Sequence, residues 1–206
     1  MSDLDLALVL AVDVSASVDR AEFELMLGGL ALAWRDPRVQ AAIAALPSGA
    51  LAVSALFWSE AQEVAVPWRR VASPEEAEAL AEALADAPRL PEARATALGE
   101  ALAASLRLLA ACPFPARRAT VDVSGDGRSN RGRPPGPFRD LAAASGITVN
   151  ALAVLDEEPD LLAYFAQEVI AGPRAFAMAC DDYAAFPEAI LRKLLREIPA
   201  APAGLA

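Results

Sequence analysis

Three short segments of this chain carry oxygen side chains of the types that bind a hard divalent cation. Asp13, Ser15 and Ser17 form an Asp-x-Ser-x-Ser pattern, Thr96 opens a later helical segment, and Asp126 lies within Ser-Gly-Asp-Gly at 124–127. Mg²⁺ prefers about six oxygen ligands and often keeps waters among them. We therefore predict a Mg²⁺ site built from these five side chains, in which Mn²⁺ or Ca²⁺ could replace Mg²⁺.

The balance of charge in this ligand set predicts what the ion would do. Asp13 and Asp126 supply two negative charges that cancel those of a divalent metal, whereas the serine and threonine hydroxyls are neutral. A third or fourth carboxylate would neutralise the ion further and complete its coordination. Because this ligand set has only two carboxylates, the metal can still attract a carboxylate from another molecule. The pattern thus favours a metal that bridges to an acidic residue of a partner protein.

Each segment also has a simpler interpretation. Asp and Ser after a strand often cap the next helix, because their side chains accept backbone N–H bonds. Thr96 could be such a cap, and Ser-Gly-Asp-Gly at 124–127 alone is more often a turn. The occurrence of all three segments in this order, each at a predicted strand end or helix start, favours the metal site.

The elements that must position these side chains alternate along the chain. Apolar strand-like runs are followed by amphipathic helical segments, and the strands are expected at 4–12, 51–58, 63–66, 119–123, 147–155 and 175–179. Such alternation predicts a three-layer α/β/α fold, doubly wound around a mainly parallel sheet. We expect one domain over 1–200 and a frayed tail at 201–206.

Ligands of open parallel sheets bind beyond the carboxyl ends of the strands. The segments at 13–17 and 124–127 each follow a predicted strand, so they converge if the first and fourth strands are neighbours. At the end of the chain we expect Asp181-Asp182 to cap a last helix running to Ile198. Its Arg192, Lys193 and Arg196 are expected on an exposed face.

Composition excludes several classes of function. The chain has no His and a single Lys, Lys193, which rules out Ser-His-Asp and Cys-His catalysis within the chain, the usual His-containing zinc sites and a P-loop. A net charge of -10 argues against a nucleic-acid partner and an anionic membrane surface. No apolar run has the length and pattern of a membrane-spanning segment.

The same motifs resemble the metal-ion-dependent adhesion site of von Willebrand factor A domains. The chain is still more similar to a bacterial family of uncharacterised proteins with that fold, through the stretches 8–15, 122–127 with Asn130, 146–150 and 190–198. The resemblance spans nearly the whole chain and implies strand order 3-2-1-4-5-6, and we expect 63–66 to pair with 51–58 as an antiparallel edge hairpin. It also implies the metal site of Asp13, Ser15, Ser17, Thr96 and Asp126, and it implies no activity.

Residues around the predicted metal form a candidate partner-binding rim. Arg128, Asn130 and Arg131 lie in the loop after Asp126, and Arg94 lies just before Thr96, where the resemblance leads us to expect a more Gly-rich segment. These arginines could contact an acidic partner, although the loop could also be merely solvated.

We therefore expect a metal-dependent protein-binding module rather than an enzyme, and no hydrolase activity. One alternative is a Mg²⁺-dependent small-molecule or phosphoryl-transfer enzyme on a similar sheet. Ser15 argues against this alternative, because it occupies the position where such an enzyme would need a second catalytic Asp. Another is a scaffold whose metal site is vestigial. The chain is expected in the cytoplasm if it is complete, and in the periplasm or outside the cell if a leader has been removed.

Overall fold

The computed structural model describes residues 3–89 and 95–199 of the 206-residue chain. Its six strands form one sheet in the order β3-β2-β1-β4-β5-β6, in which β2 and β3 are antiparallel and the other neighbours parallel. The strands are β1 (Leu4–Asp13), β2 (Leu51–Trp58), β3 (Gln62–Val71), β4 (Ala116–Gly125), β5 (Thr148–Val154) and β6 (Ala177–Cys180). The expected strand order and antiparallel edge strand are confirmed.

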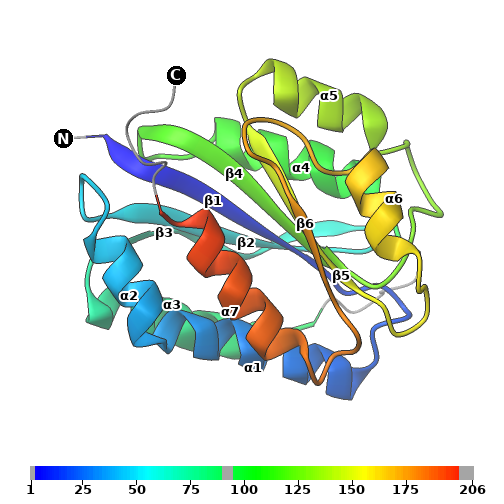
Figure 1. Cartoon of the computed structure of the whole chain (residues 1–206), viewed down its shortest axis with the longest axis horizontal. Helices are drawn as coiled ribbons and strands as arrows, with labels where there is room; N and C mark the ends of the chain where they lie inside the picture. Colours follow the sequence, from blue (N-terminus) through cyan, green and yellow to red (C-terminus); the bar gives the residue numbers. More distant parts are fainter. Residues whose placement is uncertain (1–2, 90–94, 200–206) are drawn as a thin grey trace.

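Helices cover both faces of this sheet (Figure 1). One layer contains α1 (Arg20–Arg35), α2 (Pro37–Ala44), α3 (Pro74–Ala85) and α7 (Phe186–Glu197). The other contains α4 (Leu98–Ala110), α5 (Gly136–Ala144) and α6 (Leu161–Glu168). The predicted three-layer α/β/α architecture is therefore confirmed.

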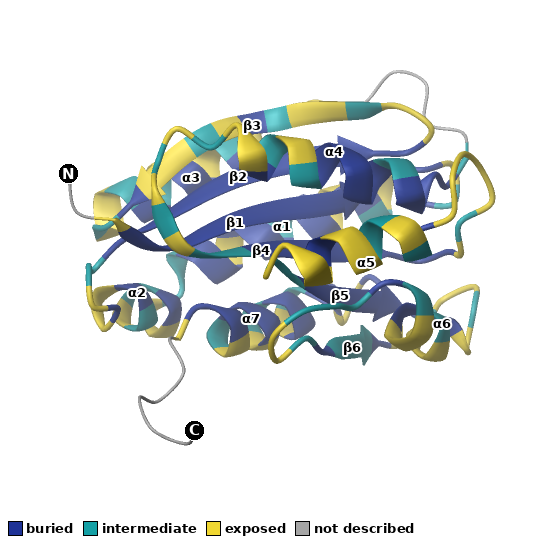
Figure 2. Cartoon of the chain, turned by 90° about the horizontal axis from the view of Figure 1, so that it is seen from above, coloured by how far each residue is buried: buried dark blue, intermediate teal, exposed yellow. Residues whose placement is uncertain are grey.

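The central strand β1 explains why the sheet needs two helical layers. All of its residues are buried, as the dark strands in Figure 2 show. Because side chains alternate across a strand, Leu6, Leu8 and Leu10 belong to the core beneath α1, α3 and α7. Ala7, Val9 and Ala11 belong to the core beneath α4, α5 and α6. The small residues of this second set contribute little apolar area, so α4 and α6 supply the larger Leu and Phe side chains on that face.

Some elements are longer than the sequence indicated. β3 runs from Gln62 to Val71 rather than over 63–66, because an edge strand exposes polar residues such as Arg69 and Arg70 that break the apolar pattern. β4 begins at Ala116 rather than at 119 for a similar reason, since its first residues are only partly buried.

Two expectations for the last helix are wrong. Asp181-Asp182 does not cap it: α7 begins at Phe186, and the Asp182 carboxylate instead accepts a hydrogen bond from the backbone N of Ala185, at 2.8 Å. Lys193 is not exposed but fully buried, where it pairs with Asp122 of β4 and Glu197. A buried opposite charge on the sheet draws this part of α7 inward.

Other expectations fall outside what the structure describes. Arg94 and the tail at 201–206 lie beyond the described residues. Within 3–89 and 95–199, no helix combines the length and apolarity needed to cross a bilayer.

Candidate metal centre

The candidate centre lies where β1 and β4 end. These strands are parallel neighbours in register, with Val12 opposite Ser124, so the residues that follow them leave the sheet at the same edge. Asp13 is the last residue of β1, and Asp126 comes directly after β4. The sheet topology thus brings together two carboxylates that are far apart in the sequence.

Asp13 has an unusual environment for a carboxylate. It is fully buried, and its Oδ1 accepts a hydrogen bond from the backbone N of Ser15 at 2.8 Å. Its Oδ2 is buried and has no hydrogen-bond partner among the described residues. Burial and the nearby negative charge of Asp126 raise the pKa of Asp13 to about 8. A buried carboxylate without a partner is costly unless a positive charge compensates it.

A chain of hydroxyl groups connects the other candidate ligands. Thr96 Oγ1 donates to Ser15 Oγ at 3.4 Å, and the Ser15 and Ser17 hydroxyls lie 3.2 Å apart. Ser17 Oγ then donates to Asp126 Oδ1 at 2.8 Å. The structure therefore gathers Asp13, Ser15, Ser17, Thr96 and Asp126 into one cluster of oxygen atoms.

The simpler capping interpretation fails for two of these residues. Helix α1 is capped by Asp19, whose side chain accepts from Glu22 N while the Glu22 side chain accepts from Asp19 N. Helix α4 begins after Ala97 and has no side-chain cap. Asp13 and Thr96 are therefore not used as helix caps, and their oxygens remain available to the cluster.

Gly125 lets the backbone of β4 pass close to Asp13. A Cβ atom at this position would lie 2.8 Å from Asp13 Oδ2 and 3.2 Å from Asp13 Cβ. Every other residue type would thus press on the unpartnered oxygen. This close passage keeps open the space that a ligand of that oxygen would use.

The donor set fits a hard divalent cation that is not fully satisfied by carboxylates. Two aspartates and three hydroxyls are the oxygen ligands that Mg²⁺ accepts. Within the part of the chain that the structure describes, no three Asp, Glu, Cys or His side chains gather as a possible metal cluster. A cation here would depend on the hydroxyls, on water and on a ligand from outside.

Asn130 supports the site in a way that its predicted place on the rim did not suggest. Its side-chain Oδ1 accepts from Thr96 N at 2.9 Å, and its backbone N donates to Thr96 O at 2.9 Å. This double connection joins the loop after β4 to the segment before α4. Although Asn130 is exposed, it positions Thr96.

Two further residues near the cluster were not singled out from the sequence. Arg89 donates to the backbone oxygens of Ser15 (3.1 Å) and Val18, and so holds the loop after β1. Tyr183 follows β6, and burial together with the charges of Asp126 and Asp13 raises the pKa of its hydroxyl. The position of Tyr183 after a parallel strand was the one sequence signal that could have indicated it.

The predicted rim arginines differ in how far they are already paired. Arg128 makes ion pairs with Glu158 (3.0 Å) and Asp160 and stacks over the Tyr164 ring at 4.9 Å. Arg131 is exposed and has no ion pair among the described residues. Of the two rim arginines that the structure describes, Arg131 is therefore the one that is free to contact an acidic partner.

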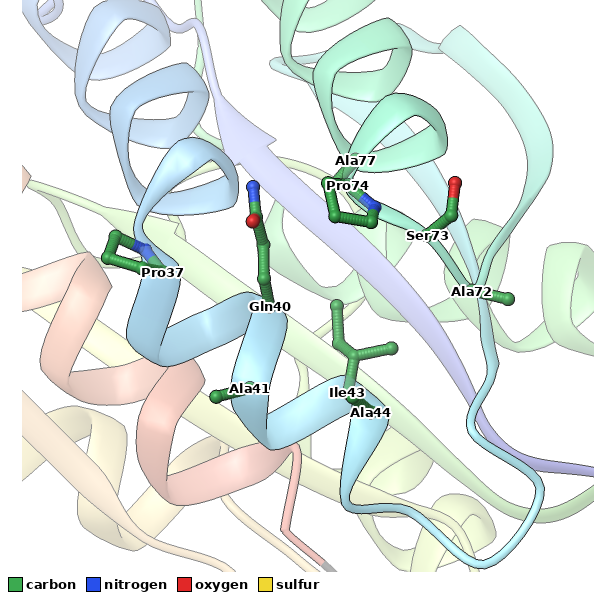
Figure 3. A pocket seen from close by; sticks show the side chains of 9 residues that line it. All are labelled: Pro37, Gln40, Ala41, Ile43, Ala44, Ala72, Ser73, Pro74 and Ala77. Atoms are coloured by element: carbon green, nitrogen blue, oxygen red, sulfur yellow. The ribbon is translucent and has the colours of Figure 1, made fainter.

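A separate hollow between α2 and α3 does not offer comparable chemistry (Figure 3). It has a volume of about 310 Å³ and is lined mainly by Ala, Pro and Ile43. Its two polar side chains are already engaged, because Gln40 donates to Arg35 O at 3.4 Å and Ser73 accepts from Glu76 N at 3.3 Å. The cluster at the ends of β1 and β4 is therefore the stronger candidate site.

Residues 3–202 match the sequence profile of a protein family described as "Protein of unknown function (DUF1194)". The chain belongs to this family. No curated protein matches the chain. The family assignment agrees with the resemblance to uncharacterised proteins and adds no activity.

Several solved structures have a similar fold. A von Willebrand factor type A protein from Catenulispora acidiphila has a TM-score of 0.66 at 17% identity, over 95% of this chain and 43% of that one. The pilus adhesin SpaC from Lactobacillus rhamnosus GG has a TM-score of 0.67 at 16% identity, over 95% and 30%.

A third neighbour is proximal thread matrix protein 1 from the mussel byssus, in a structure with a zinc-occupied MIDAS motif. Its TM-score is 0.63 at 14% identity, over 94% of this chain and 48% of that one. This DUF1194 chain spans less than half the length of each of these three proteins. At such identities, the likeness shows the von Willebrand factor A-like fold alone.

Proposed function

We propose that this DUF1194 protein is a binding module that holds a divalent cation, with Mg²⁺ as the expected ion, and uses it to bind a carboxylate of a partner protein. Asp13 and Asp126 would balance the charge of the ion, and Ser15, Ser17 and Thr96 would provide neutral oxygens. The chemistry that the ion supplies is attraction of one further anionic ligand.

The observation that carries this proposal is the buried, unpartnered Oδ2 of Asp13 beside a second carboxylate. The other oxygen, Oδ1, accepts from Ser15 N, so the contact with the backbone accounts for only one of the two oxygens of this buried carboxylate. Gly125 keeps the space next to it open, and the Ser15 and Ser17 hydroxyls of the same cluster lie 3.2 Å apart. A cation would compensate the charge that the protein leaves unbalanced.

The similar structures support the same type of site. The mussel matrix protein has a MIDAS motif that holds zinc, and SpaC is an adhesin. Both have the fold of this chain, and the pattern of Asp13, Ser15, Ser17, Thr96 and Asp126 resembles such a motif. These parallels favour protein binding over catalysis.

The charge of the chain suggests how a partner would be selected. With a net charge of -10, the protein as a whole repels an acidic partner, whereas the ion and the exposed Arg131 would attract it locally. An attractive point on a repulsive surface favours specificity over affinity. The partner should therefore present an accessible Asp or Glu for the ion, close to a surface that can accommodate the positive charge of Arg131.

Affinity capture tests this function. The purified protein is used to capture partners from an extract of its native host in Mg²⁺ and in EDTA, together with Asp13→Ala and the control Asp3→Ala, which removes an exposed carboxylate at the opposite edge of the sheet. We expect a partner that is retained only in Mg²⁺, lost with Asp13→Ala and kept with Asp3→Ala. Retention of the same partners in EDTA by folded Asp13→Ala would refute metal-dependent binding.

A further inference from the structure

A second polar cavity lies near the amino ends of the parallel strands, at the opposite end of the sheet from the candidate metal centre. It has a volume of about 270 Å³ and lies between the first residues of β4 and β5, the turn before β6 and the last turn of α7. Its lining includes Arg118, Thr120, Thr148, Arg174, Phe176 and Arg196. At a rise of about 3.3 Å per residue, Arg118 and Asp126 are roughly 25 Å apart along β4. The two sites are therefore separate.

Arg118 lines this cavity and has donors that the protein does not use. Its Nη1 donates to Glu197 O at 2.7 Å and its Nη2 to Ile198 O, which satisfies carbonyls at the end of α7. A guanidinium has five N–H groups, and the buried Nε of Arg118 has no partner among the described residues. Capping α7 thus explains only part of the hydrogen-bonding capacity of Arg118.

Two more guanidinium groups converge on the same cavity. Arg196 stacks over the Phe176 ring, with 3.8 Å between its Cζ and the ring centroid. Burial lowers the pKa of Arg118, and the positive charge of Arg174 lowers it further, which shows that these two cations act on each other. The stacking of Arg196 and the capping bonds of Arg118 hold these two guanidiniums in place. Binding of a ligand would therefore cost little further side-chain entropy.

The backbone at Arg174 is held in an unfavourable conformation. Arg174 has φ 58, and it is the one described residue other than glycine with a positive φ. The turn is pressed against the start of β5, since a Cβ on Gly172 would lie 2.2 Å from Ile147 O. Left-handed backbone on a non-glycine residue persists where the surrounding structure imposes it. Here this packing places an arginine at the cavity.

No carboxylate neutralises this group of arginines. Within the described ranges, neither Arg118, Arg174 nor Arg196 forms an ion pair. Glu197 lines the cavity, but its Oε1 already accepts from Lys193 (2.9 Å) and Asn150 (2.8 Å).

The state of the nearby carboxylates leaves the cavity positive. Burial and the charge of Asp122 raise the pKa of Glu197, and its Oε1 lies 2.9 Å from the Lys193 ammonium, which balances the charge of Glu197 whenever it is ionised. Asp5, the other carboxylate that acts on Arg118, pairs with Arg117 at 3.4 Å and with Ser48. Three guanidiniums thus lie together, without compensation, in a chain whose net charge is -10.

We propose that this cavity binds a small phosphate-bearing anion, either free phosphate or a phosphate monoester. Guanidinium groups donate pairs of N–H bonds that match phosphate oxygens. The hydroxyl of Thr120 lies in the same lining and can add a neutral hydrogen bond, whereas the Thr148 hydroxyl already donates to Pro173 O at 3.1 Å. A volume of about 270 Å³ is large compared with roughly 30 Å³ for one water molecule, so a small organic phosphate has room to enter.

Calorimetry tests this proposal directly. Inorganic phosphate and glycerol 3-phosphate are titrated separately into the full chain in EDTA, at an ionic strength matched with chloride. We expect saturable binding at millimolar concentration with one site per chain. Tighter binding of the monoester would identify an organic phosphate, and equal binding would identify phosphate itself.

The variants are chosen so that folding does not obscure the result. Arg174→Gly removes the guanidinium and suits the positive φ, and Arg196→Met keeps an unbranched chain over Phe176. Each should weaken binding at least tenfold, whereas Arg192→Met, an exposed position on the same helix, should not. No saturable binding, or equal weakening by Arg192→Met, would overturn the proposal. Unchanged binding by Asp13→Ala would show that the two sites are independent.

Discussion

The Ser17 hydroxyl donates to Asp126 Oδ1 at 2.8 Å, which joins two loops separated by 109 residues. This contact exists because β1 and β4 are parallel neighbours and end at the same edge of the sheet. Thr96, from the segment before α4, reaches the same cluster through Ser15. The candidate metal centre is thus a product of the sheet topology rather than of any one loop.

Gly125→Ala should damage the candidate metal centre through crowding. The new Cβ would lie 2.8 Å from Asp13 Oδ2, so either Asp13 or β4 must shift. We expect at least a tenfold loss of Mg²⁺ affinity by calorimetry and a lower melting temperature. Gly28→Ala is the control, because nothing lies within 4 Å of a Cβ there and alanine favours the helix. Unchanged Mg²⁺ affinity in Gly125→Ala would argue against a role for the space beside Asp13.

Asn130→Ala should weaken metal binding without touching the ion. It removes the hydrogen bond from Thr96 N to Asn130 Oδ1, a contribution of about 0.5–1.5 kcal/mol, or roughly two- to tenfold in affinity. The comparison is Gln167→Ala, which removes an exposed amide from α6. If both variants bind Mg²⁺ like the wild type, Asn130 does not position Thr96 for this purpose.

Lys193→Met should destabilise the fold strongly. Lys193 is fully buried between Asp122 and Glu197, and its removal leaves buried carboxylates without a cation. Breaking such a pair from one side costs about 3–5 kcal/mol. Urea denaturation measures this loss, with the exposed Arg192→Met as the comparison. A change below about 1 kcal/mol would mean that Lys193 is not held as the structure shows.

The ion pair between Arg133 and Glu100, which anchors the loop after β4, should make a part of the folding stability depend on pH. Its hydrogen bonds with Arg133 are the main reason why the pKa of Glu100 falls from 4.5 to about 2. Because the folded-state pKa is lowered, the pair stabilises the fold fully above about pH 4.5, and this stabilisation is lost as the pH falls towards 2. NMR titration of the Glu100 carboxyl measures the pKa directly. In Arg133→Met we expect that pKa to return towards 4.5, and a wild-type value near 4.5 would contradict the ion pair.

The sequence was sufficient for the layers of the fold and for the convergence of the candidate ligands. Alternating strands and helices imply a parallel sheet, and in such a sheet Asp13 and Asp126 lie at one edge once their strands are neighbours. Helical spacing was less successful at predicting which side chains are buried, because contacts with other elements determine this. Lys193 shares helical spacing with exposed arginines, and its burial depends on Asp122 on a different element.

Asp122 itself offered a signal that pattern analysis did not use. A charged residue inside a buried strand requires a partner, and Lys193 is the single lysine of the chain. For Tyr183 and Asn130 the sequence indicated only a position after a strand or in a loop, because their contacts depend on how loops from distant segments fold over the site. Positions of this kind follow from three-dimensional packing and not from spacing along the chain.

Calorimetric titration of Mg²⁺ into the metal-free protein tests the central claim most directly. The wild type is compared with Asp13→Asn and with Asp3→Asn, an exposed aspartate at the other edge of the sheet, and circular dichroism melting monitors the fold. We predict one saturable Mg²⁺ site per chain that Asp13→Asn abolishes, that Asp3→Asn preserves and for which Mn²⁺ and Ca²⁺ compete. In EDTA, Asp13→Asn should melt no lower than the wild type, because burial and the charge of Asp126 disfavour an ionised carboxylate at this position. Absence of saturable binding of any of these ions to the wild type, or equal binding by folded Asp13→Asn, would contradict the account.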